Sequence, residues 1–357
     1  MTDHAFAQVF AGPGQPLRYE RIRLPSSLRP GEALLAVDLA TICGSDLHTT
    51  GGRRRQPTPA VLGHEGVGRV AASERGGLEV GERVSWSIAD SCGQCRFCLG
   101  HHLPEKCLHL FKYGHADLDD GCGLNGAYAT HLLLRPGTAA VPVPEEIPDG
   151  VASTANCALS TAVNSVEQVP EGAASALVQG AGLLGIYACA LLNERGLRVL
   201  CSDPLPERRD LAARFGAVGL DPASDPGERR ERVLELAPDG VDAVLEMSGE
   251  TPAVAAGLDL VRTGGTYVLV GMVHPDSDLA GITGERIVFK CLTIRGVHNY
   301  SPRHLQEGIE FLRRTVGRYP FEDLLGPTLP LSELEEGLAL SRQRRWLRVA
   351  VAPGMEG

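Results

Sequence analysis

Four cysteines stand close together in the first third of the chain. Cys92, Cys95, Cys98 and Cys107 are separated by two, two and eight residues. Four thiolates at such spacing can close a tetrahedron around Zn²⁺, and they leave no coordination position open for a substrate. The segment 92–107 therefore predicts a structural zinc site. An iron–sulfur cluster and four unmetallated thiols in a cytosolic loop are the alternatives.

A second set of metal-binding side chains is dispersed along the chain. Cys43 lies in TICGSDLH, His64 and Glu65 lie in VLGHEGVG, and Cys157 lies in NCALST. Two thiolates and an imidazole with an open fourth position suit Zn²⁺ acting as a Lewis acid. Spacing alone does not bring these residues together, since a single buried cysteine or histidine more often simply packs in a core.

A glycine-rich turn has the pattern of a dinucleotide site. Gly180, Gly182 and Gly185 form GxGxxG between a strand-like segment and a helix that opens with Leu183 and Leu184. Such glycines allow a tight turn and let a pyrophosphate approach the helix N-terminus, where unpaired N–H groups favour negative charge. The alternative is that the glycines only pack a helix on a sheet.

The residues after this turn bear on the choice of cofactor. Asp203 ends the next strand and is placed to accept hydrogen bonds from the ribose hydroxyls. A carboxylate there would repel a 2′-phosphate, so the sequence predicts NAD in preference to NADP. Arg208 and Arg209 follow closely and weaken that distinction.

The surrounding elements indicate how these residues are positioned. Up to about residue 150 the chain consists of short apolar runs broken by Gly and Pro, which predicts a strand-rich, irregular domain. From residue 173 onward strands and helices alternate, which predicts a parallel sheet covered on both faces. We expect an α/β protein with a catalytic zinc domain at 1–157, a Rossmann domain at 158–300, and a segment 301–357 that returns to the first domain.

Composition restricts the possible partners. A chain of 357 residues exceeds one ordinary core, so two domains are expected. The net charge of −10 offers no positive field for nucleic acid or an anionic membrane, which favours a small-molecule substrate. The N-terminal residues lack a basic region followed by an apolar stretch, and no run approaches the ~18 apolar residues of a membrane span. We expect a cytoplasmic protein.

Taken together and in order, the motifs CGSDLH, GHEGVG, the four-cysteine segment, NCALST and the dinucleotide turn resemble the medium-chain zinc-dependent alcohol dehydrogenase family. The resemblance covers essentially the whole chain. It implies a GroES-like first domain, two zinc ions per chain, NAD, and a homodimer or homotetramer. It also implies that Cys43, His64 and Cys157 bind the catalytic zinc, with Glu65 as an exchangeable ligand or a neighbouring carboxylate.

The same resemblance assigns further roles. Ser45 and His48 would relay the proton of the alcohol to water, and Asp46 would orient His64 or nearby backbone. Ser45 and Asp46 could instead cap a helix or turn. Arg348 in WLRVAVAP matches a position that contacts the cofactor phosphates, and its alternative is a solvated charge at a strand edge.

The chain departs from the family pattern in two places. Gly44 stands where relatives carry a basic residue that touches the pyrophosphate. The last gap of the four-cysteine segment is one residue longer than usual, which predicts a local bulge with the metal retained.

The substrate is suggested by a finer resemblance. The segments 110–115, 124–149 and 297–305 are similar to a subgroup associated with phosphonate metabolism. This implies a hydroxyalkylphosphonate such as 2-hydroxyethylphosphonate, or phosphonoacetaldehyde in the reverse direction. The first candidates for binding the phosphonate are Lys112, His298 and Asn299. Arg303 and the arginine run at 53–55 are further candidates.

Each of these residues also has a simpler interpretation, as a surface charge, a solvated loop or a capped turn. A polyol, amino-alcohol or short-chain secondary alcohol dehydrogenase is the alternative function. A zinc-free relative of the same fold would lack the metal ligands that are present here.

Overall fold

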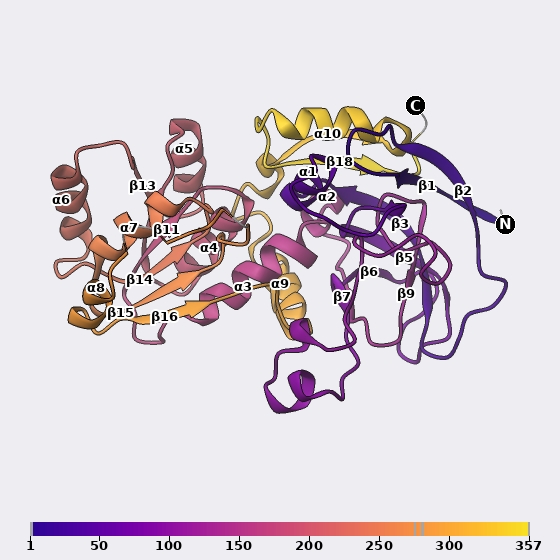
Figure 1. Ribbon diagram of the computed structural model, residues 1–357, viewed down its shortest axis with the longest axis horizontal. Helices are drawn as coiled ribbons and strands as arrows, with labels where there is room; N and C mark the ends of the chain where they lie inside the picture. The colour runs from indigo at the N-terminus through magenta and orange to yellow at the C-terminus, as the bar shows by residue number, and fades with distance from the viewer. Residues whose placement is uncertain (1–2, 275, 280–281, 356–357) are drawn as a thin grey trace. The chain divides into compact units, whose positions relative to one another are not determined.

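The computed structural model describes residues 3–274, 276–279 and 282–355 (Figure 1). It divides into two compact units, one of residues 1–157, 301–316 and 321–357 and the other of residues 158–300 and 317–320. The predicted fold class is confirmed: the first unit is rich in antiparallel strands and the second holds a parallel sheet between helices. Within the described residues, every helix is too short or too polar to cross a membrane.

The first unit is built mainly from strands. They are β1 His4–Phe10, β2 Arg18–Arg23, β3 Ala33–Thr41, β4 Ala60–Val61, β5 Glu65–Ser73, β6 Arg83–Trp86, β7 Ala89–Asp90, β8 Phe111–Lys112, β9 His131–Leu134, β10 Ala140–Pro142, β17 Leu325–Pro330 and β18 Arg348–Ala352. Its helices are α1 Gly44–Thr50, α2 Asp149–Ala152, α9 Pro302–Thr315 and α10 Leu334–Arg342, with short turns η1 Arg96–Gly100, η2 Pro104–Lys106, η4 Phe321–Leu324 and η5 Leu331–Glu333. The turn η3 Ala155–Leu159 crosses the boundary between the units.

The main sheet of this unit joins distant parts of the chain. Its strand order is β10-β6-β5-β3-β18-β17, with β9 also paired to β3. At its centre Thr41 of β3 pairs with Glu65 of β5 on one side and with Ala350 of β18 on the other. The fully buried Leu35, Trp86 and Tyr128 pack in the core beside this sheet.

The second unit has six parallel strands in the order β13-β12-β11-β14-β15-β16. The strands are β11 Ser175–Gln179, β12 Arg198–Ser202, β13 Ala217–Leu220, β14 Val241–Glu246, β15 Val261–Leu269 and β16 Thr293–Gly296. The helices are α3 Ser160–Glu167, α4 Leu183–Glu194, α5 Pro206–Arg214, α6 Pro226–Leu236, α7 Thr251–Leu260 and α8 Gly284–Phe289. This strand order is that of the Rossmann fold, in which the ligand lies beyond the carboxyl ends of the central strands.

A glycine sets the end of α5. The helix ends at Arg214, and Ala217 already begins β13. Gly216 takes a φ of +86°, which favours glycine and turns the chain out of the helix.

Candidate functional site

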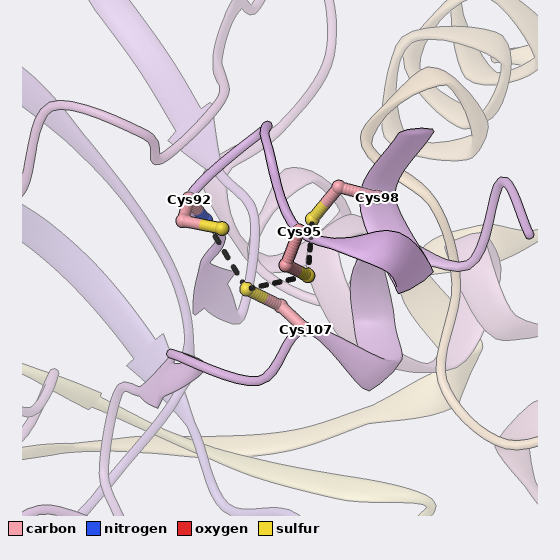
Figure 2. A group of neighbouring side chains, drawn as sticks. All are labelled: Cys92, Cys95, Cys98 and Cys107. Atoms are coloured by element: carbon pink, nitrogen blue, oxygen red, sulfur yellow. Dashed lines mark hydrogen bonds between the residues drawn. The ribbon is translucent and has the colours of Figure 1, made fainter. Parts of the chain in front are cut away.

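The four cysteines of the segment 92–107 face one another (Figure 2). Their sulfur atoms all lie within 4.8 Å of each other. Cys95 Sγ is 3.5 Å from Cys98 Sγ and 3.9 Å from Cys107 Sγ. A zinc–sulfur bond of 2.3 Å in a tetrahedron implies sulfur atoms about 3.8 Å apart. The spacing of these donors therefore fits Zn²⁺.

Backbone N–H groups contact the sulfur atoms of this loop. The amides of Cys92 and His109 donate to Cys107 Sγ at 3.2 and 3.3 Å. A backbone hydrogen bond from Leu108 contributes most to lowering the pKa of Cys95 to about 6. A deprotonated thiol is the form that binds metal.

The longer gap after Cys98 is accommodated by an unusual local conformation. η1 (Arg96–Gly100) is a π-helical turn closed by the His101 amide donating to the Arg96 carbonyl at 3.0 Å. His102 follows with a φ of +55°. A π turn takes in one residue more than an α turn, so the expected bulge occurs here and the four sulfur atoms still converge.

The dispersed ligands meet in the first unit. Cys43 follows β3 and precedes α1, His64 lies just before β5, Glu65 opens β5, and Cys157 lies in η3. Their ligand atoms all lie within 4.8 Å of one another. A hydrogen bond with Cys157 and the charge of Arg348 hold the pKa of Cys43 well below its usual value despite burial. We call these four residues the metal-ligand group.

Two local contacts hold the parts of this group together. The Asn156 side chain donates to the His64 carbonyl at 2.9 Å and accepts from the Gly66 amide at 3.4 Å, which joins η3 to β5. Gly63 has a φ of +86°, and a Cβ there would lie 2.8 Å from the ring of Tyr128. The turn before His64 therefore requires glycine.

Asp46 lies beside the histidine. It is 1% exposed, and it accepts from the Cys43 amide at 2.9 Å and from the Tyr128 hydroxyl at 2.8 Å. Its other oxygen lies 3.6 Å from His64 Nδ1. A carboxylate behind a ligating imidazole fixes the ring and makes it a better ligand. Asp46 therefore binds the backbone amide of Cys43 and lies beside the His64 ring, and its role in orienting that ring stays a prediction.

The two residues expected to relay a proton lie on α1. Ser45 Oγ is 3.4 Å from His64 Nε2, so the hydroxyl borders the metal-ligand group. His48 is three residues further along the same helix and is exposed. Positions separated by three residues are neighbours on a helix surface, so this face of α1 leads from the metal-ligand group toward solvent.

Glu65 and Arg348 form a buried ion pair that the sequence did not predict. Arg348 Nε and Nη2 donate to the two Glu65 carboxylate oxygens at 2.7 and 2.8 Å, and Thr41 Oγ1 donates to Glu65 at 2.8 Å. Arg348 Nη2 also lies 3.7 Å from Cys43 Sγ. Cofactor phosphates were the expected partner of Arg348, but its guanidinium pairs with Glu65 beside the metal ligands. The pair is 283 residues apart in sequence and meets only because β18 lies next to β3.

The three glycines of the dinucleotide turn, in the second unit, have different surroundings. Gly180 has a φ of +99°, and a Cβ at Gly185 would lie 1.8 Å from the Gly180 carbonyl oxygen. Gly182 is the N-cap residue of α4, and a Cβ there would meet nothing within 4 Å. Leu183 and Leu184 form the first turn of α4, where N–H groups lack partners within the helix. This arrangement fits a pyrophosphate.

The acidic residue of this site is fixed by backbone. Asp203 accepts from the Ala181 amide at 2.8 Å and from the Leu205 amide at 3.0 Å. Arg209 donates to the Asp203 carbonyl at 2.7 Å and to Asp221 at 3.1 Å, so its charge is engaged. Arg208 lies half-buried in the first turn of α5.

The residues that were expected to bind a phosphonate belong to different units of the chain. Lys112 lies in the first unit on β8 and is half-buried. His298 and Asn299 lie in the second unit, where the Asn299 carbonyl accepts from Asn164 at 2.9 Å. Arg303 is exposed on α9 and pairs with Glu307. In the arginine run, residues 53 and 55 are exposed and only Arg54 is half-buried.

The fold and the two groups of metal-binding residues define a zinc-type oxidoreductase with a dinucleotide-binding domain, and comparison with known proteins agrees. Residues 29–145 match the alcohol dehydrogenase GroES-like domain, and residues 184–314 match the zinc-binding dehydrogenase domain. The chain belongs to the medium-chain zinc-dependent alcohol dehydrogenase family.

Individual relatives cover almost the whole chain. L-threonine 3-dehydrogenase of Stenotrophomonas maltophilia is 29% identical over 90% of this chain and 92% of its own. 5-exo-Hydroxycamphor dehydrogenase of Pseudomonas putida is 28% identical over 87% and 89%. The crystal structure of an alcohol dehydrogenase from Thermotoga maritima has a TM-score of 0.91 at 29% identity, with 98% and 99% coverage. The family uses zinc and NAD(P), and the donor sets and the glycine turn fit both.

Proposed function

We propose that this protein interconverts a small alcohol and its aldehyde or ketone, with NAD as the hydride carrier. The observation that carries the proposal is the convergence of Cys43, His64 and Cys157 in one buried group with Glu65. When bound, zinc supplies a Lewis acid that withdraws charge from the substrate oxygen, and NAD accepts the hydride. Oxidation then releases one carbonyl compound, NADH and one proton.

The residues of the chain itself would manage that proton. Ser45 borders His64 and takes the proton from the substrate hydroxyl, and exposed His48 passes it to water. Asp46 keeps the His64 ring in its orientation throughout. In the reverse direction the same groups return the proton to the carbonyl oxygen.

The preference for NAD rests on Asp203. Its carboxylate lies beside the glycine turn and would meet the adenosine ribose, where a 2′-phosphate would be repelled. Arg209, one of the two arginines that follow this strand, already donates to the Asp203 carbonyl and to Asp221. Replacement of Asp203 by alanine should lower the ratio of kcat/KM with NAD to kcat/KM with NADP.

We propose a hydroxyalkylphosphonate such as 2-hydroxyethylphosphonate as the substrate. Support comes from the motif resemblance and from the position of Lys112, a half-buried cation close enough to Cys43 and Cys157 for their charges to act on it. A polyol, amino-alcohol or short-chain secondary alcohol is the second candidate, because relatives named for threonine and hydroxycamphor match most of the chain.

One set of assays tests the proposal. Zinc-loaded protein is given NAD or NADP with 2-hydroxyethylphosphonate, L-threonine, sorbitol and plain short alcohols, and NADH is followed by absorbance. We expect turnover with NAD, about two zinc ions per chain, and a kcat loss of about 10²-fold or more in Ser45→Ala and His48→Gln. Absence of turnover with every alcohol in fully metallated protein would contradict the proposed reaction. Faster turnover of a neutral alcohol than of the phosphonate would contradict only the substrate.

We also propose a cytoplasmic homodimer or homotetramer that joins through the edge of the Rossmann sheet. β16 is one of the two terminal strands of that sheet, and its Ile294 is 41% exposed; Val288 and Phe289 at the end of α8 are 69% and 75% exposed. An exposed edge strand can pair with another chain, and exposed apolar side chains favour such an interface. Replacement of Phe289 by glutamate should lower the mass measured by light scattering to that of a monomer.

A further inference from the structure

A cluster of polar side chains adjoins the metal-ligand group within the first unit. The ring of His115 stacks on that of His64, with centroids 5.4 Å apart. His115 Nδ1 donates to Gln56 Oε1 at 3.0 Å, and Thr49 of α1 also contacts Gln56 Oε1, at 3.5 Å. A chain of contacts therefore runs from His64 through His115 to Gln56, in the loop that follows α1.

Two hydrogen-bond donors in this cluster are buried without an acceptor. Among the described residues, Arg54 Nη1 and Gln56 Nε2 have no hydrogen-bond partner and no exposed surface. A buried donor that makes no hydrogen bond costs about 1–3 kcal/mol of folding free energy, and a charged donor costs more. Lys112 lies half-buried nearby, and none of the ion pairs in the described chain includes it. Natural proteins rarely leave buried donors unsatisfied, and a missing ligand is one explanation.

The charged side chains of this cluster, Arg54 and Lys112, are both cations. Burial lowers the pKa of Lys112, and the charge of Arg54 lowers it further, so the two cations repel each other at close range. Of the carboxylates in and beside the metal-ligand group, Glu65 pairs with Arg348, and one oxygen of Asp46 accepts from Tyr128.

Of the three consecutive arginines at 53–55, only Arg54 is turned toward this cluster. The amides of Arg53 and Arg54 both donate to the His48 carbonyl, at 2.9 and 3.1 Å, which closes the end of α1. Beyond that turn Arg53 and Arg55 face solvent, while Arg54 Nη1 is buried. A purely solvated loop would have left all three side chains exposed.

We propose that Arg54, Lys112 and Gln56 form an anion subsite beside the metal-ligand group, which binds the tetrahedral oxyanion of a small alcohol substrate. The inference rests on the proposed function, since the alcohol must also reach the metal-ligand group. Arg54 and Gln56 supply N–H donors, Lys112 supplies a second positive charge, and a dianionic phosphonate satisfies all three. A short chain between hydroxyl and anion suits the contact of His115 with both Gln56 and His64.

Binding of the anion is measured first, without turnover. Zinc-loaded protein is titrated with ethylphosphonate, which carries the anion but no hydroxyl, and binding is followed by calorimetry. We expect Arg54→Leu and Lys112→Met each to weaken binding about 10- to 100-fold, as for a hydrogen bond to a charged group. Arg55→Leu is the matched control, because the same substitution one position along falls on an exposed side chain. Its binding should stay within about two-fold of the parent.

Substrate selectivity is measured second. 3,3-Dimethylbutan-1-ol has the shape of 2-hydroxyethylphosphonate without its charge, so the ratio of the two kcat/KM values isolates the anion. That ratio should fall about 10- to 100-fold in Arg54→Leu. Arg54→Lys, which keeps the charge, should recover part of it. Gln56→Glu places a carboxylate beside Arg54 and Lys112 and should suppress ethylphosphonate binding. Replacing the phosphonate by isethionate or 3-hydroxypropanoate tests how much the dianion contributes.

The outcomes separate the subsite from the reaction. Ethylphosphonate binding that is lost in Arg54→Leu but kept in Arg55→Leu supports the subsite even if every alcohol fails to react. Turnover of neutral alcohols with no ethylphosphonate binding overturns the subsite and leaves the dehydrogenase intact. Equal weakening by Arg54→Leu and Arg55→Leu also overturns the subsite, because it would reflect net charge alone.

Discussion

The buried pair of Glu65 and Arg348 should be worth far more to the protein than an exposed pair of the same geometry. Arg69 and Glu145 also form a two-pronged pair, at 3.0 and 3.1 Å, but their side chains are 44% and 71% exposed. Those of Arg348 and Glu65 are 11% and 0% exposed. Removing one partner of a buried pair strands a charge and costs about 3–5 kcal/mol, whereas an exposed pair contributes about 0–1 kcal/mol.

The perturbation is Arg348→Met, with Arg69→Met as the matched control. Both tryptophans of the chain, Trp86 and Trp346, lie in the first unit, so fluorescence during urea unfolding reports on the unit that holds both pairs. We expect a loss of about 3–5 kcal/mol for Arg348→Met and at most about 1 kcal/mol for Arg69→Met. Zinc content is measured for each variant, so that loss of metal is recognised as a separate contribution.

A double variant tests the cause. If the loss comes from the stranded Glu65 carboxylate, Arg348→Met combined with Glu65→Gln should be more stable than Arg348→Met alone. The reasoning is refuted if Arg348→Met costs no more than Arg69→Met while the KM for NAD rises about ten-fold or more. That result would mean that the charge of Arg348 serves the cofactor phosphates, as the motif resemblance implied, and that its contact with Glu65 is incidental.

Three further predictions concern the metal sites and the second unit. Asp46→Asn should weaken zinc binding at the metal-ligand group about 10- to 100-fold in chelator competition, with the zinc of the four-cysteine loop as an internal reference; equal affinities would contradict the role of Asp46. Cys98→Ala should halve the zinc content and expose the segment 92–107 to protease, and an unchanged digestion pattern would show that metal does not order the loop. Burial raises the pKa of Asp242, but hydrogen bonds from the Arg262 side chain and from backbone amides outweigh this and hold it below its ordinary value. Its contribution to stability is therefore present above the unfolded pKa of about 3.9 and lost as pH falls through the lower folded value; Asp242→Asn should reduce the acid-induced loss of stability seen by circular dichroism, and an identical pH profile would contradict this.

Sites formed by residues that lie close together in the sequence could be predicted from the sequence alone. The four cysteines lie within one short segment, so their spacing alone indicated a tetrahedral site. The dinucleotide turn is likewise local, since Gly180 and Gly185 are five residues apart and come into close contact where the turn enters the helix. The alternation of strands and helices also predicted the Rossmann sheet, because parallel strands require crossover helices between them.

Tertiary structure decided the contacts between residues that are distant in sequence. β3, β5 and β18 come from three parts of the chain, and only their pairing brings Glu65 onto Arg348 instead of leaving Arg348 at a solvated strand edge. The orientation of Arg54 depends on backbone contacts with the end of α1, so three consecutive arginines with the same local propensity reach different surroundings. Sequence patterns report the face or turn that a residue occupies, whereas the partner of a buried charge is set by which strands and loops become neighbours on folding.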